Sequence, residues 1–239
     1  GTEYYDKRMW KVEAADESHV SLVLHSPDGD QGFPGEMDIH VTYTLTEENE
    51  VKLHYHAVPD RDTLLSLTNH SYFNLSGHAS GKVLDQEVII CGDAYTRADK
   101  ESIPTGELVC VEGTPMDFRK GKPIGRDIES DYEALIFGQG YDHNWALDGR
   151  GSRQAAAMYS EQSGIEMKVY TDLPGMQFYT GNFIESERGK KGAVYRKRQA
   201  ACFETQYFPD AVHKEAFEGP VVRAGEVYDT VTTYQFSQR

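Results

Sequence analysis

The sequence has little cysteine, no long hydrophobic run and few basic residues. Its three cysteines are an odd number without a CxxC pair (Cys91, Cys110 and Cys202). A disulfide framework is therefore not expected, and a reducing, cytoplasmic compartment is favoured. No apolar run approaches the length of a membrane span. The 24 Lys and Arg residues are outnumbered by 39 Asp and Glu residues, and the net charge is −15. This balance argues against nucleic acid or an anionic membrane as a partner, because both attract basic surfaces.

Several common sequence motifs are also missing. "FGQGYD" contains Gly138 and Gly140 but no third glycine, so it is not a dinucleotide-binding fingerprint. There is no GxSxG, no HExxH and no phosphate-binding loop, and no His/Cys pair has structural-zinc spacing. His54 and His56 lie on the polar side of an alternating stretch, which favours surface histidines, whereas His143 is less clear. The start, "GTEYYDKRMW", has neither a Met nor a signal-peptide pattern. The sequence therefore predicts no metal site.

Alternation of apolar and polar residues is the strongest structural signal. Residues 37–46 place Met37, Ile39, Val41, Tyr43 and Leu45 on one face, and residues 51–57 alternate in the same way, which predicts an antiparallel hairpin. Further strands are predicted at 19–26, 64–69, 86–91, 107–112, 155–160, 165–171, 176–183, 199–205 and 227–236. Short strands separated by Gly/Pro turns indicate an all-β fold, an antiparallel sandwich or barrel, in one domain over residues 1–239.

The stretch "CFETQYFPDAV", residues 202–212, contains a carboxylate whose role is ambiguous. Period-2 alternation places Cys202 and Glu204 on one face of a strand and Phe203 and Thr205 on the other. If the Cys202 face is the inner one, Glu204 points inward. Most carboxylates are nevertheless surface groups with an ordinary ion-pair partner, so position alone leaves both readings open.

Four stretches combine aromatic residues with a few polar groups. They are "LTNHSYFNLSGH" (67–78), "YDHNWAL" (141–147), "GMQFYTGNF" (175–183) and "CFETQYFPDAV" (202–212). Aromatic faces suit the C–H side of a sugar, and Asn, Gln, Asp, His and Glu suit its hydroxyl groups. The combination indicates a site for a polyhydroxylated ligand.

In these four stretches the chain resembles the aldose 1-epimerases. "SPDGDQGFPGEMDIHVTYTL", "MDFRKGKPIGRDI" and the C-terminal "PVVRAGEVYDTVTTYQFS" are also similar to signatures of that family. The resemblance implies a large antiparallel β-sandwich, the galactose mutarotase-like supersandwich. It further implies that the chain interconverts the α and β anomers of free hexoses such as galactose and glucose. The implied partner is a small aldose, and no cofactor is expected.

The resemblance also assigns roles to four residues. His70 in "TNHSYFNL" matches the general acid that protonates the ring oxygen, and Glu204 in "FETQYF" matches the general base that takes the C1 hydroxyl proton. Asp142 in "YDHNW" matches a substrate-binding carboxylate, and Gln177 in "GMQFYTGNF" matches an amide that contacts the sugar. Three aromatic residues could wall the cleft or pack in the core (Tyr72, Trp145 and Phe178).

The usual N-terminal strands of the family, which end near "LHGG", are lacking from this sequence. In the family they supply a substrate-contacting arginine and a second histidine. Three explanations are open. The chain is a fragment, or a second polypeptide supplies the strands, or the truncation is natural and weakens activity.

Three other functions are compatible with the same residues. A non-catalytic sugar-binding protein could use the same sandwich, although it would need neither a proton donor nor a base. An isomerase of hexose 6-phosphates would need arginines, and the four stretches contain none. A glycosidase would need two carboxylates, which Asp142 and Glu204 could supply, so the position of His70 decides between these chemistries.

Overall fold

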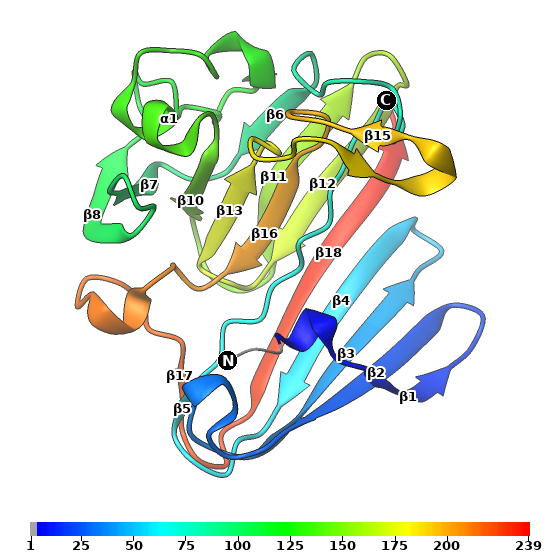
Figure 1. Cartoon of the computed structure of the whole chain (residues 1–239), viewed down its shortest axis with the longest axis vertical. Coiled ribbons are helices and arrows are strands. Elements are labelled where there is room, and N and C mark those ends of the chain that lie inside the picture. Colours follow the sequence, from blue (N-terminus) through cyan, green and yellow to red (C-terminus); the bar gives the residue numbers. More distant parts are fainter. Residues whose placement is uncertain (1–3) are drawn as a thin grey trace.

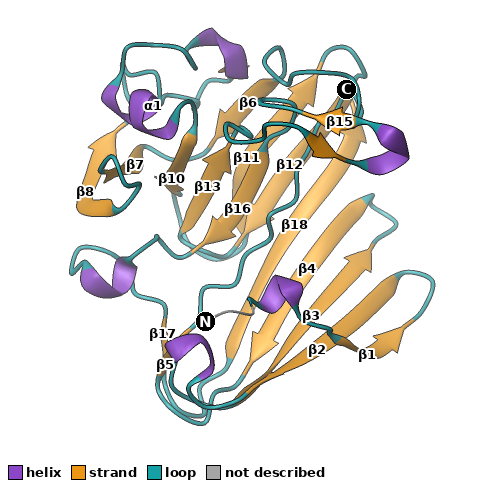
Figure 2. Cartoon of the chain, in the orientation of Figure 1, coloured by secondary structure: helices purple, strands orange, loops and turns teal. Residues whose placement is uncertain are grey.

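The computed structural model describes residues 4–239, and its architecture is two antiparallel β-sheets packed face to face (Figures 1 and 2). In spatial order the nine-stranded sheet consists of β1 (Lys11–Ala15), β2 (His19–Ser26), β3 (Met37–Leu45), β4 (Glu50–Ala57), β18 (Tyr228–Gln238), β12 (Ile165–Thr171), β11 (Arg153–Ser160), β6 (Glu87–Ile90) and β9 (Lys122–Pro123). The five-stranded sheet consists of β16 (Cys202–Gln206), β13 (Gly175–Tyr179), β10 (Asp142–Ala146), β7 (Ala94–Ala98) and β8 (Pro104–Cys110).

Smaller elements lie between the strands of the two sheets. β5 (Thr63–Leu64) pairs with β17 (Val221–Val222), and β14 (Glu187–Arg188) pairs with β15 (Val194–Tyr195). The α-helix α1 is Glu133–Gly138. The 3₁₀ turns among the described residues are η1 (Tyr5–Lys7), η2 (Asp30–Gly32), η3 (Ile124–Arg126), η4 (Lys190–Gly192) and η5 (Ala211–His213). None of the helices within residues 4–239 is long and apolar enough to cross a membrane.

Several strands form as predicted. The stretches predicted at 19–26 and 165–171 are β2 and β12, and the predicted hairpin is β3 paired with β4. The alternating apolar residues of β3 and β4 face the core, where Ile39 and Leu53 are almost fully buried. The prediction of an all-β, antiparallel sandwich is confirmed.

Two of the strands are shorter than predicted, and several others were not predicted. The stretch 64–69 forms only the two-residue β5, after which the chain runs alongside the sheets as an irregular segment. The stretch 176–183 ends at Tyr179, because the chain turns at Gly181, whose φ of +63° suits glycine. β1, β7 and β10 were not predicted as strands, and neither were the two-residue strands β9, β14, β15 and β17.

The core lies between the two sheets. The five-stranded sheet contributes the fully buried rings of Trp145, Phe178 and Phe203, and Met158 and Met167 come from the nine-stranded sheet. Two hydrogen bonds also cross between the sheets. The Tyr234 hydroxyl donates to the Phe203 carbonyl over 2.9 Å, and the hydroxyls of Thr205 and Thr232 are 2.5 Å apart. These contacts fix the position of β16, the strand that carries Glu204.

Candidate active site

A polar cleft of about 460 Å³ opens on the outer face of the five-stranded sheet. The residues that line it are His70, Tyr72, Asp142, Gln177, Tyr179, Phe183, Glu204, Gln206 and Pro209. The fold therefore brings together all four predicted site residues, which come from β10, β13, β16 and the irregular segment after β5.

Strand pairing explains why Glu204 lies in this cleft. Phe203 and Thr205 point into the core between the sheets, so Glu204 and Cys202 point to the opposite face of β16. The Cys202 face is thus not the core face, although Glu204 is only 8% exposed because other groups cover it. Gln177 of β13 is directly opposite Glu204 in the antiparallel register.

Asp142 and Gln177 form a second, linked pair. Asp142 is the first residue of β10 and is opposite Tyr179 in the pairing of β10 with β13. The Gln177 amide donates a hydrogen bond of 2.7 Å to the Asp142 carboxylate. A glycine is required nearby at Gly175, since a Cβ there would lie 2.7 Å from both the Asn144 Oδ1 atom and the Phe208 ring. Because glycine has no side chain, the Asn144 amide and the Phe208 ring can both lie close to this position.

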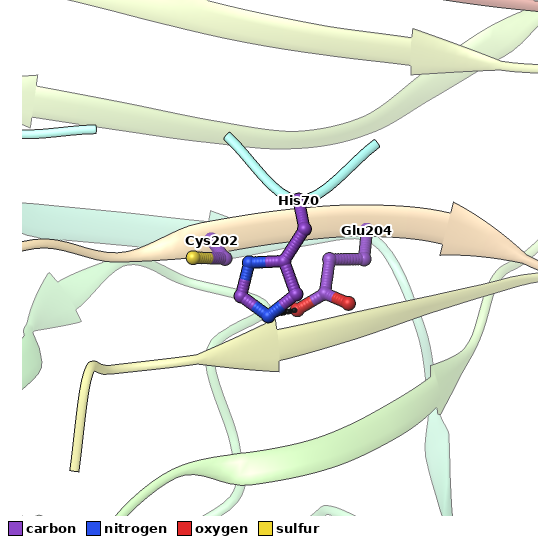
Figure 3. Close-up of side chains that lie close together, drawn as sticks. All are labelled: His70, Cys202 and Glu204. Atoms are coloured by element: carbon purple, nitrogen blue, oxygen red, sulfur yellow. Dashed lines mark ion pairs between the residues drawn. The ribbon is translucent and has the colours of Figure 1, made fainter. Parts of the chain in front are cut away.

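His70 reaches the cleft from the irregular segment, which is fastened to the end of β16. Phe73 and Ala201 exchange two backbone hydrogen bonds of 2.8 and 2.9 Å. The Ser71 N–H donates to the Asn69 side chain and forms a tight local turn. The His70 ring lies 4.9 Å from the Tyr72 ring and 5.9 Å from the Tyr179 ring, centroid to centroid. As a result its Nε2 atom lies 3.4 Å from the Glu204 Oε1 atom (Figure 3).

The two carboxylates of the cleft have raised pKa values. Burial, followed by repulsion from the charge of Asp142, raises the pKa of Glu204 from 4.5 to about 8. Burial also raises the pKa of Asp142, and this effect is partly offset by the hydrogen bond from Gln177 and the charge of His70. A carboxyl group whose pKa lies near the working pH can both take and return a proton.

Replacing Asp142 by asparagine should lower the pKa of Glu204 below about 8, because it removes the second largest cause of the rise while leaving the burial. The measurement is a ¹³C NMR titration of the Glu204 carboxyl group. Asp85→Asn, at an exposed turn, is the matched control and should leave the titration unchanged. An unchanged pKa of Glu204 in Asp142→Asn would show that the two carboxylates do not interact.

Other residues of the cleft were not predicted from the sequence. Tyr179, Phe183, Gln206 and Pro209 line it, and Tyr179 could have been found because it lies two positions after Gln177 on the same strand face. Of the three aromatic residues with two possible roles, Tyr72 lines the cleft. Trp145 and Phe178 are core residues with no exposed surface.

His143, which the sequence left undecided, is a core histidine. Its ring contacts the rings of Tyr95 and Trp145, and burial lowers its pKa to about 4. His54 lies on the exposed side of β4 near Asp229, as predicted for a surface histidine. Neither residue belongs to the cleft.

The cleft contains no Lys or Arg among its described lining residues. A site for a sugar phosphate would need such cations, so the alternative of a hexose 6-phosphate isomerase is disfavoured. A larger cavity of about 830 Å³ lies beside it, lined mainly by apolar side chains including Phe73, Ile184 and Phe236. The predicted acid and base, His70 and Glu204, both line the smaller cleft.

Comparison with known proteins identifies the family. The family model "Aldose 1-epimerase" matches residues 1–235. Galactose mutarotase of Homo sapiens is 41% identical over 239 residues, covering 99% of this chain and 68% of that protein. Aldose 1-epimerase of Escherichia coli is 36% identical and is covered to 69%. The chain thus spans about two thirds of the length of these relatives.

Solved structures agree with this result. A GalM/aldose epimerase homologue from C. elegans superposes with a TM-score of 0.87 at 29% identity, covering 97% of this chain and 69% of that chain. Galactose 1-epimerase from Lactobacillus acidophilus gives a TM-score of 0.85 at 27% identity, with 98% of this chain and 68% of that chain covered. The chain therefore belongs to the aldose 1-epimerase family and is an isomerase.

Proposed function

We propose that this chain interconverts the α and β anomers of free hexoses such as galactose and glucose, with His70 as general acid and Glu204 as general base. The supporting observation is the 3.4 Å separation of the His70 Nε2 atom and the Glu204 Oε1 atom in one polar cleft. The two oxygens that exchange protons in this reaction are bonded to the same carbon, C1. An acid and a base whose reactive atoms lie this close can each reach one of them.

The reaction needs two proton transfers and no redox step. His70 gives a proton to the ring oxygen while the Glu204 carboxylate takes the proton of the C1 hydroxyl. The bond between C1 and the ring oxygen breaks, and C1 becomes an aldehyde. After rotation about the C1–C2 bond, the hydroxyl group formed from the ring oxygen attacks the other face of the aldehyde. His70 then recovers its proton, and Glu204 returns one to the new C1 oxygen.

Asp142 and Gln177 would bind the sugar hydroxyls. Their 2.7 Å hydrogen bond fixes the amide, whose oxygen and second N–H then remain for a ligand. The rings of Tyr72 and Tyr179 offer apolar faces beside them. This division between aromatic walls and a few fixed polar groups is typical of sugar sites.

Polarimetry of freshly dissolved α-galactose tests the proposal. We expect the chain to accelerate the change in optical rotation in proportion to its concentration, in buffer with a chelator. Methyl α-galactoside, which cannot open its ring, should keep its rotation. Release of methanol from that glycoside would favour the glycosidase alternative, and binding of galactose without acceleration would favour a non-catalytic sugar-binding protein.

We also propose that further polypeptide, joined to this chain or supplied by a second one, covers part of the nine-stranded sheet. Val12, Leu45 and Ile165 are 57%, 59% and 37% exposed, although they lie on the same face of the sheet as the core residues. About a third of each relative's length lies outside the matched region, which would suffice for such a cover. The prediction is that the 239-residue chain alone self-associates in native mass spectrometry. A stable, fully active monomer would contradict it.

We propose a cytoplasmic location because of the state of the three cysteines. All three are unpaired in the structure, which fits a reducing compartment.

A further inference from the structure

Three side chains that can bind metals meet at the edge of the cleft. One ligand atom each of His70, Cys202 and Glu204 can be chosen so that all three lie within 4.8 Å of one another. Figure 3 shows the His70 ring between the Cys202 and Glu204 side chains, both of which come from β16. No other group of three such residues exists within the part of the chain that the structure describes. Cys202 has no role in the proposed anomer exchange and is not among the residues that line the sugar cleft.

The geometry is close to that of a zinc site. Bonds of about 2.0–2.3 Å at tetrahedral angles place the ligand atoms of zinc roughly 3.3–3.7 Å apart. His70 Nε2 and Glu204 Oε1 are already 3.4 Å apart. Cys202 and Glu204 are fixed by strand pairing with β13, whereas the His70 side chain is about half exposed (49%) on an irregular segment. No two of the three ligand atoms are more than 4.8 Å apart, so a closure of roughly 1 Å brings the set to the spacing around a tetrahedral zinc ion.

The donor atoms select the kind of ion. A nitrogen, a sulfur and one carboxylate oxygen favour zinc or cadmium, whereas magnesium and calcium prefer oxygen ligands alone. Three protein ligands leave a fourth position for water, as in open zinc sites. The buried Cys202 thiol would lose its proton on binding, since a coordinating thiol is deprotonated by the metal.

We propose that the cleft holds an inhibitory site for a thiophilic divalent cation, with zinc bound by His70, Cys202 and Glu204. This inference rests on the proposed function, because it takes His70 and Glu204 as the acid and the base. A bound zinc ion occupies the His70 nitrogen and the Glu204 oxygen that must exchange protons, so proton transfer stops. Zinc should then weaken the binding of sugar, and sugar should weaken the binding of zinc by the same factor.

Titration calorimetry with Zn²⁺ alone tests the site. We expect one zinc ion per wild-type chain and a loss of affinity of at least tenfold in Cys202→Ser. Cys110→Ser removes an exposed thiol outside the cleft, so it is the matched control and should bind zinc as the wild type does. Co²⁺ gives an independent readout, since its thiolate-to-metal absorption band should be present in the wild type and Cys110→Ser and absent in Cys202→Ser.

Activity provides the functional arm of the test. Cys202→Ser should retain anomer exchange in the presence of a chelator and lose most of its inhibition by Zn²⁺. Because Cys202 is fully buried, the fold of this variant is checked by circular dichroism, and His70→Ala provides a second ligand-removing variant for the binding measurement.

The possible outcomes separate the two proposals. Equal zinc affinity in the wild type, Cys202→Ser and His70→Ala would overturn the metal site, as would a wild type that binds no zinc. Zinc binding that depends on Cys202, in a chain that does not catalyse anomer exchange, would support the metal site while refuting the proposed function.

Discussion

His70→Asn should lower kcat for anomer exchange by about a thousandfold, within the range that a general acid contributes. Asparagine keeps a polar group of similar size on the same segment but cannot donate and recover a proton at neutral pH. The segment is held by backbone hydrogen bonds between Phe73 and Ala201, which do not involve the imidazole. The fold and the sugar affinity should therefore change little. Polarimetry gives kcat, and circular dichroism verifies the fold.

The matched control is another histidine of the same sequence stretch. His78 lies outside the polar cleft, and its ring is hydrogen-bonded to the Tyr195 hydroxyl over 3.0 Å. His78→Asn should keep a nearly wild-type kcat. Equal rates for His70→Asn and His78→Asn would remove His70 from the mechanism.

Glu204→Gln should also lower kcat for anomer exchange by about a thousandfold. It should in addition stabilise the protein at high pH. The amide has the shape of the carboxyl group but cannot act as a base. In the folded protein the pKa of Glu204 is about 8, well above its ordinary value of 4.5. The folded state therefore holds a proton that the unfolded chain releases between these two pH values.

The sign of the stability effect follows from this difference. Stability contributed by the protonated Glu204 is complete below pH 4.5 and is lost as the pH rises to about 8, above which an ionised carboxylate stays buried. Glutamine carries no such charge. The variant should thus gain on the order of 1–3 kcal/mol in free energy of unfolding relative to the wild type as the pH rises through this window.

Urea denaturation at pH 5 and pH 9 measures the gain. Glu161→Gln, at an exposed turn, is the control and should show the same stability difference from the wild type at both pH values. A Glu204→Gln protein that is less stable than the wild type at pH 9 would mean that the ionised carboxylate is well paired in the cleft.

The sequence predicted the nine-stranded sheet better than the five-stranded one. β3, β4 and β12 alternate clearly because one face meets the core and the other is more exposed. β10 is buried along His143–Trp145, and the polar residues of "DHNWA" hide its strand character. Of its polar residues, Asp142 lines the cleft and His143 packs in the core, so the strand lacks the regular alternation of apolar and polar residues.

The site shows a similar division. Alternation correctly separated Glu204 and Cys202 from Phe203 and Thr205, but it could not tell which face was the core. The pairing of Glu204 with His70 joins residues 134 positions apart, and only the family resemblance suggested it. The sequence did not predict the proposed metal site. Cys202 is distant in sequence from His70, and no spacing rule for metal ligands connects the two residues.

In the proposed mechanism, His70 and Glu204 together move the two protons of anomer exchange. The most direct test is exchange NMR on galactose at anomeric equilibrium, comparing the wild type with His70→Asn and Glu204→Gln in buffer with a chelator. We predict cross-peaks between the α and β anomeric protons, above the buffer rate, for the wild type alone. Cross-peaks of equal strength with both folded variants would contradict the claim.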